Sequence, residues 1–196
     1  MTTPTSSCIA TPEKAAIDFT QVLAAAITRR ESFFAYAKQH NTDCYRVFHG
    51  TVEGANGLNI DRYGDAWLVQ SFHETLSEQQ LAHISQVLIQ HGDFPVVYND
   101  RSQKNSRVAN SLLNEAQDYA MSEQVMHENG IAFTTKLRHE GQDPLLFLDM
   151  RVGREYVRQH SNNKTVLNLF SYTCGIGTAA AVGGAKHGMN VDFSSF

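Results

Sequence analysis

The first apolar pattern along the chain has the three- and four-residue spacing of an amphipathic helix. Pro12 and Glu13 open it, and a second helical stretch is predicted over Glu31–Gln39. Residues 1–12 are rich in threonine and serine and have neither the basic nor the apolar segment of a signal peptide. The pattern therefore predicts a disordered tail at 1–12 and a helical segment at 13–40. The apolar face of the first helix holds Ala15, Ala16, Phe19, Val22, Leu23, Ala26 and Ile27.

Alternating apolar and polar residues then dominate, as is typical of strands. Tyr63-Gly64-Asp65 marks the turn of one predicted hairpin, and Asn129-Gly130 marks a second one. Ser77 is a plausible N-cap for the helix between them. Together these elements predict a small α+β domain over residues 41–142. The expected strands are 45–49, 58–62, 66–72, 95–98, 124–128 and 131–137, and the expected helices are 77–91 and 106–114.

After Gly141-Gln142-Asp143-Pro144 the pattern changes. A helix is predicted at 149–159, followed by an apolar strand at 165–170 that shows no alternation, as expected of a strand buried on both faces. A glycine-rich turn, a helix at 177–186 and a strand at 189–192 follow. The order strand, helix, strand predicts the opening of a parallel α/β sheet in residues 143–196.

Composition narrows the class of protein. The chain has 196 residues, 42% of them hydrophobic, and a formal net charge of −4. RNA-binding proteins usually carry a basic surface, so a strong grip on RNA by this chain alone is not supported, although a local basic patch is compatible with the charge. The three cysteines fit no metal motif, and no apolar run is long enough to cross a membrane. We expect a cytoplasmic protein with reduced thiols and no membrane partner.

The turn after the apolar strand at 165–170 is the candidate for chemistry. It delivers the backbone to a helix N-terminus, and Asp192 lies at the end of the next predicted strand, where a carboxylate can accept hydrogen bonds from both ribose hydroxyls of a nucleoside cofactor. Residues 175–180 also fit the dinucleotide pattern G-x-G-x-x-A. However, 171–173 widen the loop, which suits a sulfonium ligand better than a pyrophosphate. A glycine turn without any ligand stays open as the structural alternative.

Three ordered segments carry a family resemblance. Asn168-Leu169-Phe170-Ser171-Tyr172-Thr173, followed by Gly175, is similar to the cofactor motif of the bacterial large-subunit rRNA methyltransferases of the I and K types. Phe147-Leu148-Asp149-Met150-Arg151, with Arg154, resembles the stretch before the family's cofactor strand. His49-Gly50 and then 57–65 resemble a third segment of the I type. The match departs from the family at Asp143-Pro144, at Cys174, where glycine is frequent, and at Gly177, where serine is frequent.

The resemblance implies an α/β protein in which N-terminal helices and a small α+β domain precede the first part of a Rossmann-like methyltransferase sheet. It implies S-adenosyl-L-methionine as cofactor and ribosomal RNA as partner of the complete protein. Asp149, Arg151 and Arg154 would lie near the cofactor, with Arg154 bracing the fold. The residues implied to bind the cofactor are Asn168, Phe170, Ser171, Tyr172, Gly175, Gly177 and Asp192.

The resemblance also implies that the catalytic half of the family's sheet is missing, so the chain is expected to be truncated and inactive alone. Cys174 is not the catalytic thiol, which the family carries further downstream. An apolar strand without its neighbours exposes hydrogen-bonding edges, so we expect a homodimer or strand exchange through 165–192, or local disorder there. Two other function classes stay open: a non-catalytic module that binds RNA or protein, and a fragment of a nucleotide-cofactor oxidoreductase.

Overall fold

The computed structural model describes residues 17–102, 114–139 and 143–193. Helix α1, Phe19–Thr28, begins where the Asp18 carboxylate accepts hydrogen bonds from the Thr20 and Gln21 amides, at 3.0 and 3.2 Å. This cap places the helix start after the predicted one at Pro12 and Glu13, and the expected tail at 1–12 lies outside the described residues. Helix α2, Glu31–Gln39, has the predicted bounds.

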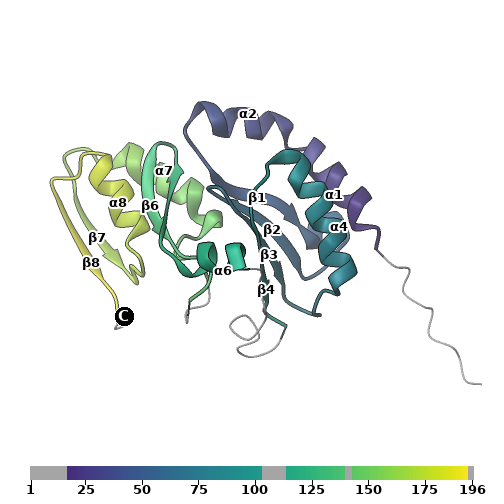
Figure 1. The fold of residues 1–196 in the computed structure, drawn as a ribbon. Helices are drawn as coiled ribbons and strands as arrows, with labels where there is room; N and C mark the ends of the chain where they lie inside the picture. Colours follow the sequence, from purple (N-terminus) through teal and green to yellow (C-terminus); the bar gives the residue numbers. More distant parts are fainter. Residues whose placement is uncertain (1–16, 103–113, 140–142, 194–196) are drawn as a thin grey trace, which may run out of the picture.

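A four-stranded sheet in the order β1-β2-β3-β4 forms the centre of the molecule (Figure 1). The first three strands pair antiparallel, and the β2–β3 turn at Tyr63-Gly64-Asp65 confirms the predicted hairpin. Strand β4 pairs parallel with β3, which requires the crossover through α4. The bounds are β1 Cys44–His49, α3 Gly50–Glu53, β2 Leu58–Tyr63, β3 Trp67–Ser71, α4 Glu78–Leu88, the 3-10 turn η1 Ile89–His91 and β4 Val96–Asp100.

Local side-chain chemistry fixes the start of α4. The Ser77 hydroxyl accepts from the Gln80 amide at 3.2 Å, and the Gln80 side chain accepts from the Ser77 amide at 2.8 Å. This reciprocal pair is a capping box, which satisfies donors that the first helical turn leaves unpaired. The predicted N-cap is therefore confirmed.

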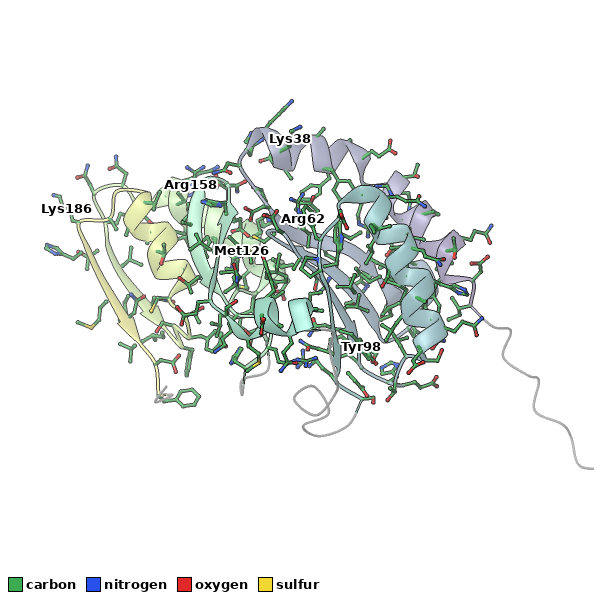
Figure 2. The ribbon with its side chains drawn as sticks, in the orientation of Figure 1. Lys38, Arg62, Tyr98, Met126, Arg158 and Lys186 are labelled. Carbon is green, nitrogen blue, oxygen red and sulfur yellow. The ribbon has the colours of Figure 1, made fainter. Side chains whose placement is uncertain are left out.

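Both faces of the central sheet are covered. Helices α1 and α4 bury one face, with Leu23, Phe48, Ile60 and Ile84 nearly inaccessible to solvent. Helix α6, Asn114–Met121, and the hairpin of β5, Gln124–Glu128, and β6, Ile131–Thr135, cover the other. Met126 points from β5 into this second core (Figure 2). The Asn129-Gly130 hairpin is confirmed, whereas the helix predicted at 106–114 lies outside the described residues except for Asn114, where α6 begins.

The C-terminal part is a parallel β-α-β unit at one end of the molecule (Figure 1). Its strand order confirms the predicted opening of an α/β sheet. Helix α8 starts two residues before the expected Gly177, and it ends at Val182, before Gly183 and Gly184, instead of at Lys186. The elements are the 3-10 turn η2 Leu148–Met150, α7 Arg151–His160, β7 Thr165–Leu169, α8 Gly175–Val182 and β8 His187–Val191.

The expectation that the 165–170 strand is buried on both faces is wrong for this structure. Helix α8 packs on one face of the β7–β8 pair, and α7 packs beside α8. No helix or strand of the described residues packs against the opposite face of this pair. Apolar side chains on that face are therefore exposed to 60% at Leu167, 55% at Leu169, 64% at Met189 and 44% at Val191. The described helices are also too short or too polar to cross a membrane.

Candidate cofactor-binding site

The loop from Phe170 to Cys174 joins the end of β7 to the first turn of α8. Phe170, Tyr172 and Cys174 have φ angles of 55°, 48° and 61°, in the left-handed region that side chains rarely occupy. Backbone strain of this kind persists only where the surroundings fix it, and it gathers at ligand sites. The conformation of Cys174 also explains why glycine suits this position in the family that the sequence resembles.

Backbone hydrogen bonds hold the loop against the end of β8. The Ser171 amide donates to the Val191 carbonyl at 3.1 Å, and the Tyr172 amide donates to the Asp192 carboxylate at 2.7 Å. The structure thus brings the loop and Asp192 together, as the sequence predicted. A carboxylate at the end of the second strand is a group that can accept hydrogen bonds from the hydroxyls of a ribose.

Two asparagines, one on β7 and one on β8, pair beside the first turn of α8. Asn168 and Asn190 are partners in the β7–β8 register, and the Asn168 side chain donates to Asn190 at 2.9 Å. A Cβ added at Gly177 would lie 2.2 Å from Asn190 Oδ1, so a side chain there would displace Asn190 from Asn168. Sequence reasoning missed Asn190; a polar residue between Met189 and Val191 was the available signal.

Segment 145–147 forms the neighbouring wall. The Thr173 hydroxyl donates to the Leu145 carbonyl at 2.6 Å, and the Tyr172 and Phe147 rings lie 5.6 Å apart between centroids. Phe170 is different, because it is 77% exposed and contacts Phe193 at 6.2 Å. Of the predicted residues, the loop therefore gathers Ser171, Tyr172, Gly175, Gly177 and Asp192 above Asn168, while Phe170 lies toward solvent.

The arginines of the 147–154 segment have structural partners. Arg154 is 3% exposed and donates to both Glu128 oxygens at 2.7 Å, which agrees with the predicted bracing role. Arg151 donates to Glu128 at 3.2 Å and to the Cys44 carbonyl. A Cβ added at Gly175 would touch only Arg154, at 3.7 Å, so the mouth of the loop at this point is open. Asp149 is exposed beside Arg46 and Leu148.

The two cysteines within the described residues, Cys44 and Cys174, have structural surroundings. Burial, and after it the charge of nearby Glu128, raise the pKa of Cys44 to about 12, so this side chain stays protonated at neutral pH. Its sulfur donates weakly to the His127 carbonyl at 3.3 Å. Cys174 serves as the N-cap residue of α8 through its backbone, and no side-chain cap hydrogen bond is formed there.

A parallel β-α-β unit with a wide loop after the first strand and a carboxylate after the second defines an α/β protein that binds a nucleoside-containing cofactor. Comparison with known proteins makes this specific. The family model of S-adenosylmethionine-dependent methyltransferases matches residues 48–195. The chain belongs to this family.

Curated relatives are longer than this chain. It is 34% identical over 169 residues to ribosomal RNA large subunit methyltransferase K/L of Pseudoalteromonas atlantica, a match covering 82% of this chain and 23% of the relative. It is 30% identical to a ribosomal RNA large subunit methyltransferase of Deinococcus radiodurans, covering 88% and 43%. The chain thus spans less than half the length of these relatives.

Solved structures agree with the family. A protein from Streptococcus mutans described as a SAM-dependent methyltransferase superposes with a TM-score of 0.72 at 27% identity, over 93% of this chain and 47% of that one. A protein described as a methyltransferase and solved in complex with S-adenosylhomocysteine gives a TM-score of 0.73 at 28% identity, with the same coverage. The shared fold therefore spans nearly all of this chain.

Replacing Asp192 with Asn should weaken binding of S-adenosylhomocysteine by about tenfold or more, because a hydrogen bond to a charged acceptor contributes about 1.5–3 kcal/mol. The amide oxygen can still accept from Tyr172, so the loop keeps its support. Isothermal titration calorimetry measures the change. Asp65→Asn, which removes the same charge from a side chain that is 78% exposed, is the matched control. Equal affinity of Asp192→Asn and the unmodified chain would exclude Asp192 from the site.

Proposed function

We propose that the protein to which this stretch belongs transfers a methyl group from S-adenosyl-L-methionine to a base of large-subunit ribosomal RNA. The observation that carries the proposal is the loop at 170–177 joined to Asp192 on a parallel β-α-β unit. Family membership supports the donor, and the names of the relatives, ribosomal RNA large subunit methyltransferases, support the acceptor. An enzyme of bacterial ribosomal RNA works in the cytoplasm, which is where we propose this protein acts.

The residues fit such a donor. The bound donor would supply an electrophilic methyl group on a sulfonium. Asp192 would accept hydrogen bonds from the ribose hydroxyls. The backbone of Ser171 and Tyr172 would border the methionine part, because the loop is wider than the tight turn that binds a pyrophosphate. Gly175 leaves the helix N-terminus open to a ligand. Asn168 and Gly177 would act indirectly by positioning Asn190 beneath the ligand: Asn168 hydrogen-bonds to Asn190, and Gly177 leaves room for the Asn190 side chain.

We also propose that this stretch alone transfers no methyl group. Methyl transfer depends on holding the sulfonium in line with the acceptor atom, which demands groups on both sides of the reacting centre. The chain spans 23% and 43% of two of its relatives. Methyl incorporation into ribosomal RNA by the purified stretch would contradict this.

S-adenosylhomocysteine should stabilise the chain against unfolding, and NAD should not. A ligand at a hundred times its dissociation constant adds about 2.7 kcal/mol to the free energy of unfolding, which a thermal-shift titration resolves. Stabilisation by NAD alone would favour an oxidoreductase. No response to either ligand would favour a non-catalytic interaction module. Both outcomes would contradict the proposed cofactor.

The exposed face of β7 and β8 supports a further proposal, self-association through 165–192. Leu167, Leu169, Met189 and Val191 form an apolar face on a pair of parallel strands, and such surfaces mark protein–protein contacts. In a dimer with two-fold symmetry each copy contributes this same face, so the apolar side chains of one copy would contact those of the other. We therefore propose that two copies meet at this face.

Sedimentation velocity should find a dimer, and Leu169→Glu should convert it to a monomer because a carboxylate buried without a partner is costly. Val152→Glu is the matched control, because Val152 is 80% exposed on α7. That variant should remain dimeric. A chain that is monomeric before any substitution, or equal effects of the two variants, would contradict the proposal.

A further inference from the structure

Two neighbouring hollows form a groove beside strands β1 to β3 of the central sheet. They have volumes of about 340 and 170 Å³ and share Arg46, Leu148 and Asp149. One wall comes from α2 and strands β1 to β3, and the other is the segment from Asp143 to Arg151. The first hollow adds Arg30, Phe33 and Arg151, and the second adds Phe72 and Arg101.

The groove borders the cofactor loop. Leu146, Phe147 and Leu148 line the second hollow, and Phe147 also contacts the Tyr172 ring at 5.6 Å. Thr173 bonds the carbonyl of Leu145 in the same segment. One short stretch of chain therefore separates the groove from the loop, so a strand lying in the groove would pass beside the cofactor.

Arginines stack on aromatic rings at both ends of the groove. Arg151 lies over the Phe33 ring at 5.4 Å, and Arg101 lies over the Phe72 ring at 4.9 Å. Each pair holds a flat guanidinium in place by cation–π attraction. Unpaired RNA bases stack on aromatic rings and on guanidinium planes, whereas duplex RNA is recognised mainly by its shape. The two pairs therefore favour a single strand.

The middle of the groove carries Arg46, which an ion pair holds in place. Arg46 donates to both oxygens of Asp61, at 2.8 and 3.1 Å. Burial raises the pKa of the Asp61 carboxyl, and the hydrogen bonds from Arg46 oppose that rise. A guanidinium has five N–H donors, and the bonds to Asp61 use two of them. The Arg46 guanidinium therefore has further N–H donors that could bind a phosphate. The Arg46 side chain is 36% exposed.

We propose that this groove binds the single-stranded RNA segment that carries the target base, an inference that rests on the proposed function. Bases stack on the Arg101–Phe72 and Arg151–Phe33 pairs, and Arg46 holds a phosphate between them. The groove is lined by four arginines and three aspartates, Arg30, Arg46, Arg101, Arg151, Asp61, Asp143 and Asp149. The formal charges of these seven lining side chains sum to +1, on a chain whose net charge is −4.

Fluorescence anisotropy with a labelled oligouridine tests the groove on the full 196-residue chain. Arg101→Gln and Phe72→Ala should each weaken binding by roughly tenfold, the scale of losing one stacked base or arginine contact. Two α7 variants are matched controls: Arg158→Gln, whose side chain is 36% exposed, and Tyr156→Ala, at a residue that is 62% exposed. They should leave the affinity for RNA unchanged.

Titration of the same variants with S-adenosylhomocysteine separates the two proposals and checks folding. Arg101→Gln and Phe72→Ala should bind it as the unmodified chain does. If the cofactor analogue binds but oligouridine does not, the groove is overturned and the methyltransferase proposal stands. Equal losses in the α7 controls, or an RNA duplex that competes as well as the single strand, would also overturn the groove. If the analogue fails to bind the unmodified chain, the proposed function itself fails.

Discussion

The buried, bidentate ion pair between Arg154 and Glu128 is the constraint on which the rest of the C-terminal architecture depends. Both side chains are almost inaccessible, and two hydrogen bonds of 2.7 Å join them. Taking two charges out of water is costly, so the pair is stable only with full hydrogen bonding. Arg151 and the Phe147 carbonyl complete it, since Arg154 also donates to that carbonyl at 2.9 Å. The pair therefore fixes α7 against the β5–β6 hairpin in one register.

This ion pair positions both the cofactor loop and the groove. Arg154 holds the Phe147 backbone, and the Phe147 ring contacts Tyr172 in the loop and lines the groove. Arg154 also lies beneath Gly175, where α8 begins. The two proposed binding surfaces thus share one support, which lets a substrate strand and a methyl donor be held in a fixed relation. Such positioning is the main requirement of a transfer reaction.

Local patterns predicted much of this fold, and long-range pairs account for what they missed. The α2 helix, the Ser77 cap and both hairpins follow from spacing and turn chemistry within a few residues. The partnership of Glu128 and Arg154 joins residues 26 positions apart and has no periodic signature. The exposure of Leu169 depends on which elements pack beside β7, and the sequence of the strand alone does not determine its neighbours. The family motif located the loop and Asp192, but the role of Asn190 required the β7–β8 register.

Hydrogen exchange of the Arg154→Met variant tests most directly whether the buried pair holds the cofactor unit in place. Removing one partner of a buried pair costs about 3–5 kcal/mol. We expect the amides of β7, α8 and β8 to exchange at least about a hundredfold faster, while those of β2 and β3 change less. Arg158→Met, which breaks a part-exposed pair with Glu155 on the same helix, should leave the exchange rates of the unit unchanged. Unaltered protection from residue 165 to 191 in Arg154→Met would contradict the account.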